Sequence, residues 1–172
     1  IVPRDGLPSG SSGGIIQMKQ TVKTDTFSKN SSSWADITGM SVSITPTRAD
    51  SKVFVMVDIK IGTDHGDSDF HIKLVRGSTD VYVGDTEGSR TSSSMGGPSY
   101  SMPSNTSDGQ YYLKQVSLNY LDSPSTTSST TYKLQIRNYG GRTNYVNRTG
   151  NDTNSQVYPR TASSITVMEV SG

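Results

Sequence analysis

The chain has 172 residues, of which 30% are apolar and 18% charged, with 16 basic against 15 acidic side chains. This balance argues against a dedicated nucleic-acid surface, and no apolar run of about 18 residues is present to insert into a membrane. The lack of cysteine excludes disulfides, zinc–thiolate sites and a thiol nucleophile.

Residues 1–14 have the composition of a linker. Pro3 and Pro8 precede a run of serines and glycines that ends at Gly14. Such a segment buries little apolar surface and is expected to be extended. We therefore predict a linker from a preceding segment over residues 1–14 and one head domain over residues 15–172.

From Ile15 onward, apolar residues recur at every second position, which is typical of β-strands. In the longest such segment both Val55 and its neighbours Phe54 and Met56 are apolar, which predicts a strand buried on both faces at its start. No segment has the apolar spacing of a long helix. We predict an all-β fold, an antiparallel β-sandwich or barrel, from eight or nine strands around residues 15–23, 40–44, 53–61, 70–74, 81–83, 116–120, 132–136 and 164–170.

Two connections, residues 85–109 and 138–162, are long and rich in Gly, Ser and Asn. Long loops on a rigid sandwich are where recognition usually resides. Tyrosine is the over-represented aromatic residue, nine against three Phe and one Trp, and its ring and hydroxyl suit contact with a ligand, although they also suit half-buried strand edges and subunit contacts. Our candidate contact residues in these loops are Tyr100, Asn105, Tyr139, Arg142, Tyr145 and Tyr158.

The densest group of metal-ligand side chains is the acidic turn containing Asp64, Asp67 and Asp69. Alternating oxygens beside glycine could hold Ca²⁺, but the turn lacks the spacing and distal Glu of a helix-loop-helix calcium site. Asp, Gly and Ser are also ordinary turn formers. We favour a solvated turn and predict neither a metal site nor a cofactor.

Catalytic patterns are poorly supported. The two histidines, His65 and His71, are not accompanied by the Gly-x-Ser-x-Gly turn of a hydrolase. Asp85, Glu87 and Asp122 could in principle supply a carboxylate pair for glycoside cleavage, but nothing in the sequence aligns them. We predict that the chain is not an enzyme, and keep a polysaccharide depolymerase as an alternative class. Glycosylation triplets such as those at Asn147 and Asn151 would matter only in a secreted eukaryotic-type binding module, a third class.

Several blocks, in a fixed order, resemble the C-terminal domains of tail-fibre proteins from marine and cyanobacterial bacteriophages. The resemblance covers nearly the whole chain, and residues 92–108 depart from it most. LDSPSTTS with TYKLQIR is its most specific part. The blocks are VPRDGLPSG (residues 2–10), TGMSVSITP (38–46), LDSPSTTS (121–128), TYKLQIR (131–137) and RTASSITVMEV (160–170).

The resemblance implies a virion structural protein, a homotrimeric fibre tip of jelly-roll type that binds a glycan or protein of the host surface. Its partners would be two further copies and other phage tail or fibre proteins. A structural fibre, decoration or tail-connecting domain without receptor binding is the alternative. The strand order also resembles trimeric tumour-necrosis-factor and complement-type heads. That likeness implies that residues 15–27 pair with 163–170, and that exposed aliphatic residues there belong to an interface.

Overall fold

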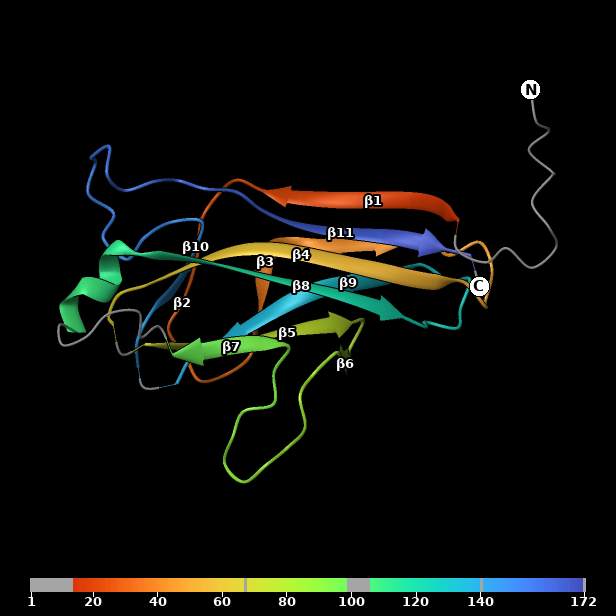
Figure 1. Ribbon diagram of the computed structural model, residues 1–172, viewed down its shortest axis with the longest axis horizontal. Coiled ribbons are helices and arrows are strands. Elements are labelled where there is room, and N and C mark those ends of the chain that lie inside the picture. Colours follow the sequence, from red (N-terminus) through yellow and green to blue (C-terminus); the bar gives the residue numbers. More distant parts are fainter. Residues whose placement is uncertain (1–13, 67, 99–105, 140, 172) are drawn as a thin grey trace.

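The computed structural model describes residues 14–66, 68–98, 106–139 and 141–171, which fold into two antiparallel sheets around one core. Sheet A has the order β1–β11–β4–β8, and a shorter part, β10 and β2, continues it beyond the end of β11. Figure 1 shows β1, β11, β4 and β8 side by side. Its strands are β1 (Ile15–Lys23), β2 (Phe27–Lys29), β4 (Lys52–Thr63), β8 (Leu113–Asp122), β10 (Asn144–Val146) and β11 (Ser163–Val170).

Sheet B has the order β3–β9–β5, and β5 is flanked on its other edge by two short strands, β6 and β7. A shift in register within β3 accompanies Gly39, whose φ of 82° lies in the left-handed region. The strands are β3 (Ala35–Ile44), β5 (Asp69–Arg76), β6 (Thr79–Val81), β7 (Met95–Pro98) and β9 (Thr130–Arg137).

This interleaved strand order is that of a jelly roll, in which both sheets draw strands from the whole length of the chain. The predicted all-β sandwich is therefore confirmed. The pairing of the first strand with the last is also present, since Lys23 lies opposite Ser163 and Ile15 opposite Val170. Described residues at both ends of the chain, Gly14 and Ser171, consequently meet at one end of the sandwich.

Alternate residues of the long strands form the core between the sheets. On β4, Val53, Val55 and Ile59 are fully buried, and Leu134 and Ile136 of β9 meet them from sheet B. Burial of this many aliphatic side chains is the main source of stability for such a fold. The period-two pattern therefore located the centre of both sheets correctly.

On two strands of sheet A, apolar residues lie on the outer face. We expected β4 to be buried on both faces at its start, but Phe54 is only half-buried and Met56 is 39% exposed. On β1 the apolar residues point away from the core: Met18 is 59% exposed, whereas Lys23 is buried. In both strands, residues on the outer face of sheet A are apolar without being covered by this chain.

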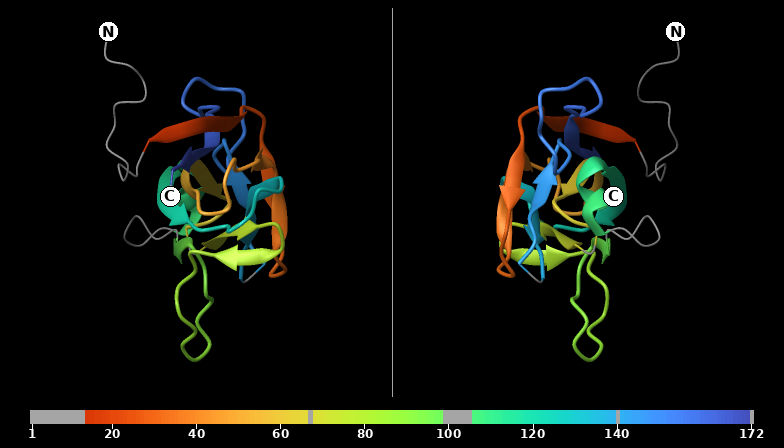
Figure 2. Two further views of the ribbon diagram at one scale, coloured as in Figure 1. Left: turned by 90° about the vertical axis from the view of Figure 1, so that its right-hand side faces the viewer. Right: turned by 90° about the vertical axis from the view of Figure 1, so that its left-hand side faces the viewer.

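The predicted long loops contain regular structure. Segment 85–109 includes β7 and the start of a 3₁₀ helix, η1 (Thr106–Tyr111), and segment 138–162 includes β10. The strand expected over 81–83 ends at Val81, because Tyr82 adopts a φ of 53° and turns the chain away. The connection between β6 and β7 then extends from the sandwich, as Figure 2 shows. No helix in the described part of the chain is long and apolar enough to cross a membrane.

Candidate functional site

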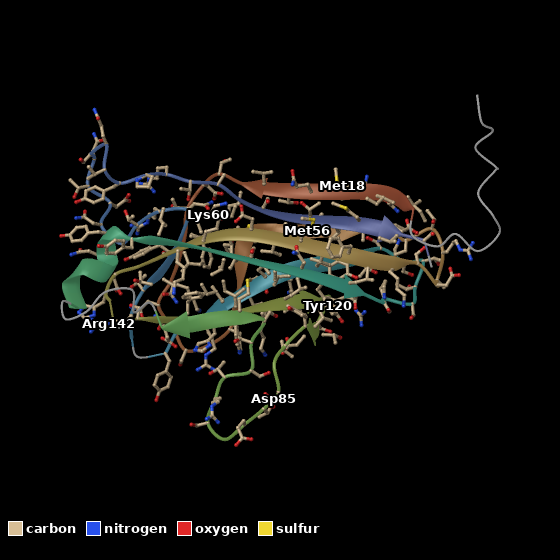
Figure 3. The ribbon with its side chains drawn as sticks, viewed as in Figure 1. Met18, Met56, Lys60, Asp85, Tyr120 and Arg142 are labelled. Carbon is tan, nitrogen blue, oxygen red and sulfur yellow. The ribbon has the colours of Figure 1, made fainter. Side chains whose placement is uncertain are left out.

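Three connections and the 3₁₀ helix η1 gather at the end of the sandwich opposite Gly14 and Ser171, whereas the β6–β7 connection extends from its side (Figure 1). We call this the distal end, and define it by η1 and the connections β4–β5, β9–β10 and β10–β11. Antiparallel pairing places it there, because β4 and β9 run toward this end and β5 leaves from it. Figure 3 shows Arg142 among these segments. Four of the six candidate contact residues, Tyr139, Arg142, Tyr145 and Tyr158, lie at this end, while Tyr100 and Asn105 lie outside the described residues.

The acidic turn anchors the β9–β10 connection. The Asp64 carboxylate accepts a hydrogen bond from the backbone N–H of Thr143 at 2.9 Å, and the Asp69 carboxylate accepts one from that of Tyr139 at 2.8 Å. Asp69 is also 2.9 Å from His71 Nε2. Asp67 lies outside the described residues, and the described ones contain no group of three acidic or histidine side chains arranged to hold a metal. Asp64 and Asp69 thus act as backbone acceptors in the structure.

Two buried asparagines hold the same connection from within. The amide nitrogen of Asn144 donates to the Asp69 carbonyl oxygen at 2.9 Å, and that of Asn138 donates to the Arg142 carbonyl oxygen. The loop backbone is therefore fixed at several points. Tyr139, whose side chain projects from this fixed backbone, is 72% exposed.

Asn147 links three segments at the distal end. Its side-chain nitrogen donates to the carbonyl oxygens of Lys23 and Asp25, at 2.9 and 3.0 Å, and its side-chain oxygen accepts from Ser163 Oγ at 2.6 Å. The residue is fully buried and has a φ of 65°. A fully buried, bonded amide is not accessible to glycosylation, so the triplet at Asn147 is structural.

Tyr145 is half-buried on β10 and differs in setting from Tyr139. The Arg148 guanidinium lies 3.6 Å from the Tyr145 ring centroid, a cation–π contact that occupies one ring face. Arg148 also donates to the Thr149 and Gly150 carbonyl oxygens, at 3.0 and 3.3 Å. Asp152 joins the cluster, 2.5 Å from Arg160 and 3.7 Å from Arg148. These contacts stiffen the start of the β10–β11 connection.

A stacked pair of tyrosines forms a second, partly exposed aromatic surface at this end. The rings of Tyr111 on η1 and Tyr158 stack with centroids 6.1 Å apart, and Asn151 Nδ2 lies 3.4 Å from the Tyr158 hydroxyl. Tyr111 and Tyr112 are 43% and 46% exposed. Tyr111 and Tyr112 were not among the predicted contact residues. Their position directly after a Gly- and Ser-rich segment was the available signal.

The ionisable groups with large pKa shifts lie away from the distal end. Burial, followed by a hydrogen bond to Asp122, raises the pKa of Tyr132 far above its usual value. Burial works to raise the pKa of Glu169, but hydrogen bonds from Gln17 and Thr47 outweigh it and lower the pKa to about 2. Both groups are structural, since each joins strands near the end where Gly14 and Ser171 meet.

A shallow hollow of about 320 Å³ also lies near that end, between the β5–β6 turn and the β8–β9 connection. Arg76 lines it, but its guanidinium is already bonded to Asp122 at 2.7 Å. The rest of the lining is neutral, and the hollow therefore offers no free charge to a ligand. Its lining residues are Arg76, Gly77, Pro124, Thr126, Ser129, Thr130 and Thr131.

Comparison with known proteins finds distant structural likenesses only. No family model matches the sequence, and no curated protein matches it. A structure of the Gt strain of infectious bursal disease virus covers 90% of this chain at 13% identity, with a TM-score of 0.42. A subviral particle of VP2 from the same virus covers 90% at 15% identity, with a TM-score of 0.37. The chain spans 42% and 39% of those two chains. The strand order described above therefore remains the basis of the fold assignment.

Proposed function

We propose that this chain is the head domain of a virion appendage, a homotrimeric, non-enzymatic structural domain that contacts a host-cell surface through its distal end. One observation carries the proposal. The ends of the described chain meet at one end of the jelly roll, and the tied, tyrosine-bearing connections form the other. A head attached through residues 1–14 would thus present the distal end outward.

The chemistry of the distal end suits reversible contact with a glycan or a protein. Tyr111, Tyr112 and Tyr139 are exposed, and tyrosine rings stack on sugar rings and on apolar side chains. Hydrogen bonds to Asp64 and Asp69 fix the Tyr139 loop before any ligand arrives, which reduces the entropy lost on binding. Three copies held together would add avidity to weak single contacts.

Three of the sequence blocks that resemble phage fibre domains lie mainly on strands, whereas LDSPSTTS lies mostly in the β8–β9 connection and residues 2–10 lie outside the described residues. TYKLQIR lies within β9, and RTASSITVMEV includes all of β11. The segment that departs most, residues 92–108, includes β7 and leads into η1. A shared framework with a divergent segment beside the exposed tyrosines is the pattern expected when recognition differs between relatives.

Adsorption of the purified 172-residue chain to intact bacteria tests this function. Fluorescently labelled protein is incubated with a panel that includes marine cyanobacteria, and retention is measured by flow cytometry. We expect retention on a subset of strains, and at least a tenfold loss with Tyr139→Ala or Tyr111→Ala. Glu87→Ala, an exposed change in the β6–β7 connection, is the matched control and should bind as the wild type does.

Three outcomes argue for other functions. An equal loss of retention with Glu87→Ala would indicate that the contact surface lies on the β6–β7 connection. No retention on any strain would support a structural or tail-connecting domain. Release of oligosaccharide from the cells would support a depolymerase.

A further inference from the structure

The two outer faces of the sandwich differ in chemistry. On sheet B, polar partners cover the outer face: Ser43 Oγ lies 2.7 Å from Thr131 Oγ1, and Lys133 pairs with Asp36 at 2.8 Å. Lys73 also pairs with Asp80. Side chains of this kind are satisfied by each other and by water. The outer face of sheet B is therefore an ordinary solvated surface.

On sheet A, the register places an apolar row across four strands. Met18 of β1 lies opposite Met168 of β11, Met168 opposite Phe54 of β4, and Phe54 opposite Leu121 of β8. These residues alternate with core residues such as Val55, which is fully buried, so the row is on the outer face. Figure 3 shows Met18 on β1 and Met56 on β4, with β11 between them.

The apolar row is part of a wider exposed apolar surface on this face. Beside the row lie Met56 and, where β1 begins with a bulge, Ile15 and Ile16. From their exposed fractions, the apolar side chains of this face together expose an area on the order of the roughly 300–600 Å² of the largest apolar patch on typical monomers. It is also enough to form the apolar centre of an interface that buries about 800 Å² per partner. The apolar side chains and their exposed fractions are Ile15 63%, Ile16 44%, Met18 59%, Val22 54%, Met56 39% and Leu121 51%.

The charges on this face favour a second copy as the occupant. The apolar row and the next one, Gln20–Thr166–Met56–Asn119, contain no charged side chain. Of the charged residues that flank these rows, Lys52 donates a hydrogen bond to Ser123 Oγ at 2.7 Å, and Asp58 is paired with Lys60. Two copies of a neutral apolar surface can approach without repulsion, and methionine adapts its shape to a partner surface. A strongly charged partner would find no complementary group within these rows.

We propose that the outer face of sheet A, centred on the Met18–Met168–Phe54–Leu121 row, is the surface through which copies of this chain associate. The inference rests on the proposed function for the number of copies, three. It goes further than the pairing of the first and last strands, because it places β4 and β8 in the interface as well. Burial of Met56 and half-buried Phe54 against a neighbour would explain why β4 carries apolar residues on both faces.

The test is the solution mass of the full 172-residue chain, measured by light scattering coupled to size exclusion. The wild type is expected near three times the chain mass of 18.5 kDa. Leu121→Lys and Met18→Lys each place a charge in the apolar row and should shift the mass to that of one chain. Ser41→Lys puts the same side chain at an exposed position on β3 of sheet B and should keep the wild-type mass. Circular dichroism checks that each variant retains its β-sheet signal.

The outcomes separate this inference from the proposed function. A wild type at 18.5 kDa over a hundredfold concentration range would overturn the inference, whether or not the protein adsorbs to cells. An oligomer that survives both Leu121→Lys and Met18→Lys would also overturn it. A trimer that dissociates in these two variants but adsorbs to no strain would support the interface and count against the receptor role alone.

Discussion

At the scale of single residues, the carboxylate of Asp122 bridges the two sheets. It accepts hydrogen bonds from the Tyr132 hydroxyl at 2.6 Å and from Arg76 at 2.7 Å. Asp122 belongs to β8 of sheet A, whereas Tyr132 and Arg76 belong to β9 and β5 of sheet B. Asp122 and Tyr132 are buried, so each depends on its partner to satisfy its polar atoms.

We predict that removing the Tyr132 hydroxyl and removing the Asp122 carboxylate lower the free energy of unfolding by different amounts. Tyr132→Phe leaves Asp122 bonded to Arg76 and should lower the free energy of unfolding by about 1–2 kcal/mol. Asp122→Ala leaves a buried hydroxyl and a guanidinium without their acceptor, and should cost about 3–5 kcal/mol. Urea titration monitored by fluorescence measures both. Equal effects of the two variants would show that the bridge does not hold the sheets together.

At the residue scale, some residues of the candidate site could be predicted from the sequence and others could not. Tyr139 was predicted as a contact residue; its side chain is 72% exposed, and its contact role stays a prediction. Tyr145 was placed in the same class, but Arg148 occupies one face of its ring. Asn147 could not be recognised as a buried link, because its partners Lys23 and Ser163 are distant in sequence and only the fold brings them together.

At the scale of elements, Glu169 holds β1, an edge strand of sheet A, on the sandwich. Its carboxylate accepts hydrogen bonds from Gln17 on β1 and from the Thr47 backbone and hydroxyl in the β3–β4 connection, each at 2.7 Å. The apolar side chains of β1 face outward, so polar contacts such as these help to hold the strand on the sandwich. The low pKa of Glu169 reflects how strongly its charged form is bonded.

This bonding predicts a pH dependence of stability. The pKa of Glu169 is about 2 in the folded chain against an ordinary value of 4.5, so its contribution is complete above pH 4.5 and declines as the pH falls toward 2. Thermal melting from pH 6 to pH 2 should show a steep loss in the wild type. Glu169→Gln should start less stable at pH 6 and lose less on acidification. A variant with the same slope as the wild type would contradict this role.

The strands that could be predicted were the long ones, where alternation extends over five or more residues. β2, β7 and β10 contain three or four residues each and lie in polar segments, so no period was visible. Their pairing comes from neighbours that are remote in sequence: β10 pairs with Ile61–Thr63 of β4 on one side and with β2 on the other. The direction of the β1 apolar face was also hidden, because alternation fixes two faces without saying which one meets the core.

At the scale of the whole molecule, the two halves of the chain are interwoven. β4 of the first half lies between β8 and β11 of the second, and β9 of the second half lies between β3 and β5 of the first. Within the described residues, the chain passes from the first half to the second through the β6–β7 connection. It extends into solvent, with the Arg90 side chain 76% exposed.

We therefore predict that a cut after Arg90 leaves the fold intact. Limited trypsin digestion should cut there, because exposed loop tips are the preferred sites of cleavage. The fragments ending at Arg90 and beginning at Thr91 should separate on a denaturing gel but elute together on native size exclusion. Arg90→Gln should suppress this cut. Separation of the fragments under native conditions would contradict the interwoven topology.

The pairing of β1 with β11 has a consequence for biosynthesis. In the described sheet, β1 has β11 as its hydrogen-bonded neighbour, so the first strand of this domain to be synthesised has no described partner strand until residues 163–170 have been made. A nascent chain that stops short of these residues leaves both β1 and the flank of β4 unpaired. Unpaired strand edges invite aggregation and degradation, so copies that end before β11 would be prone to both.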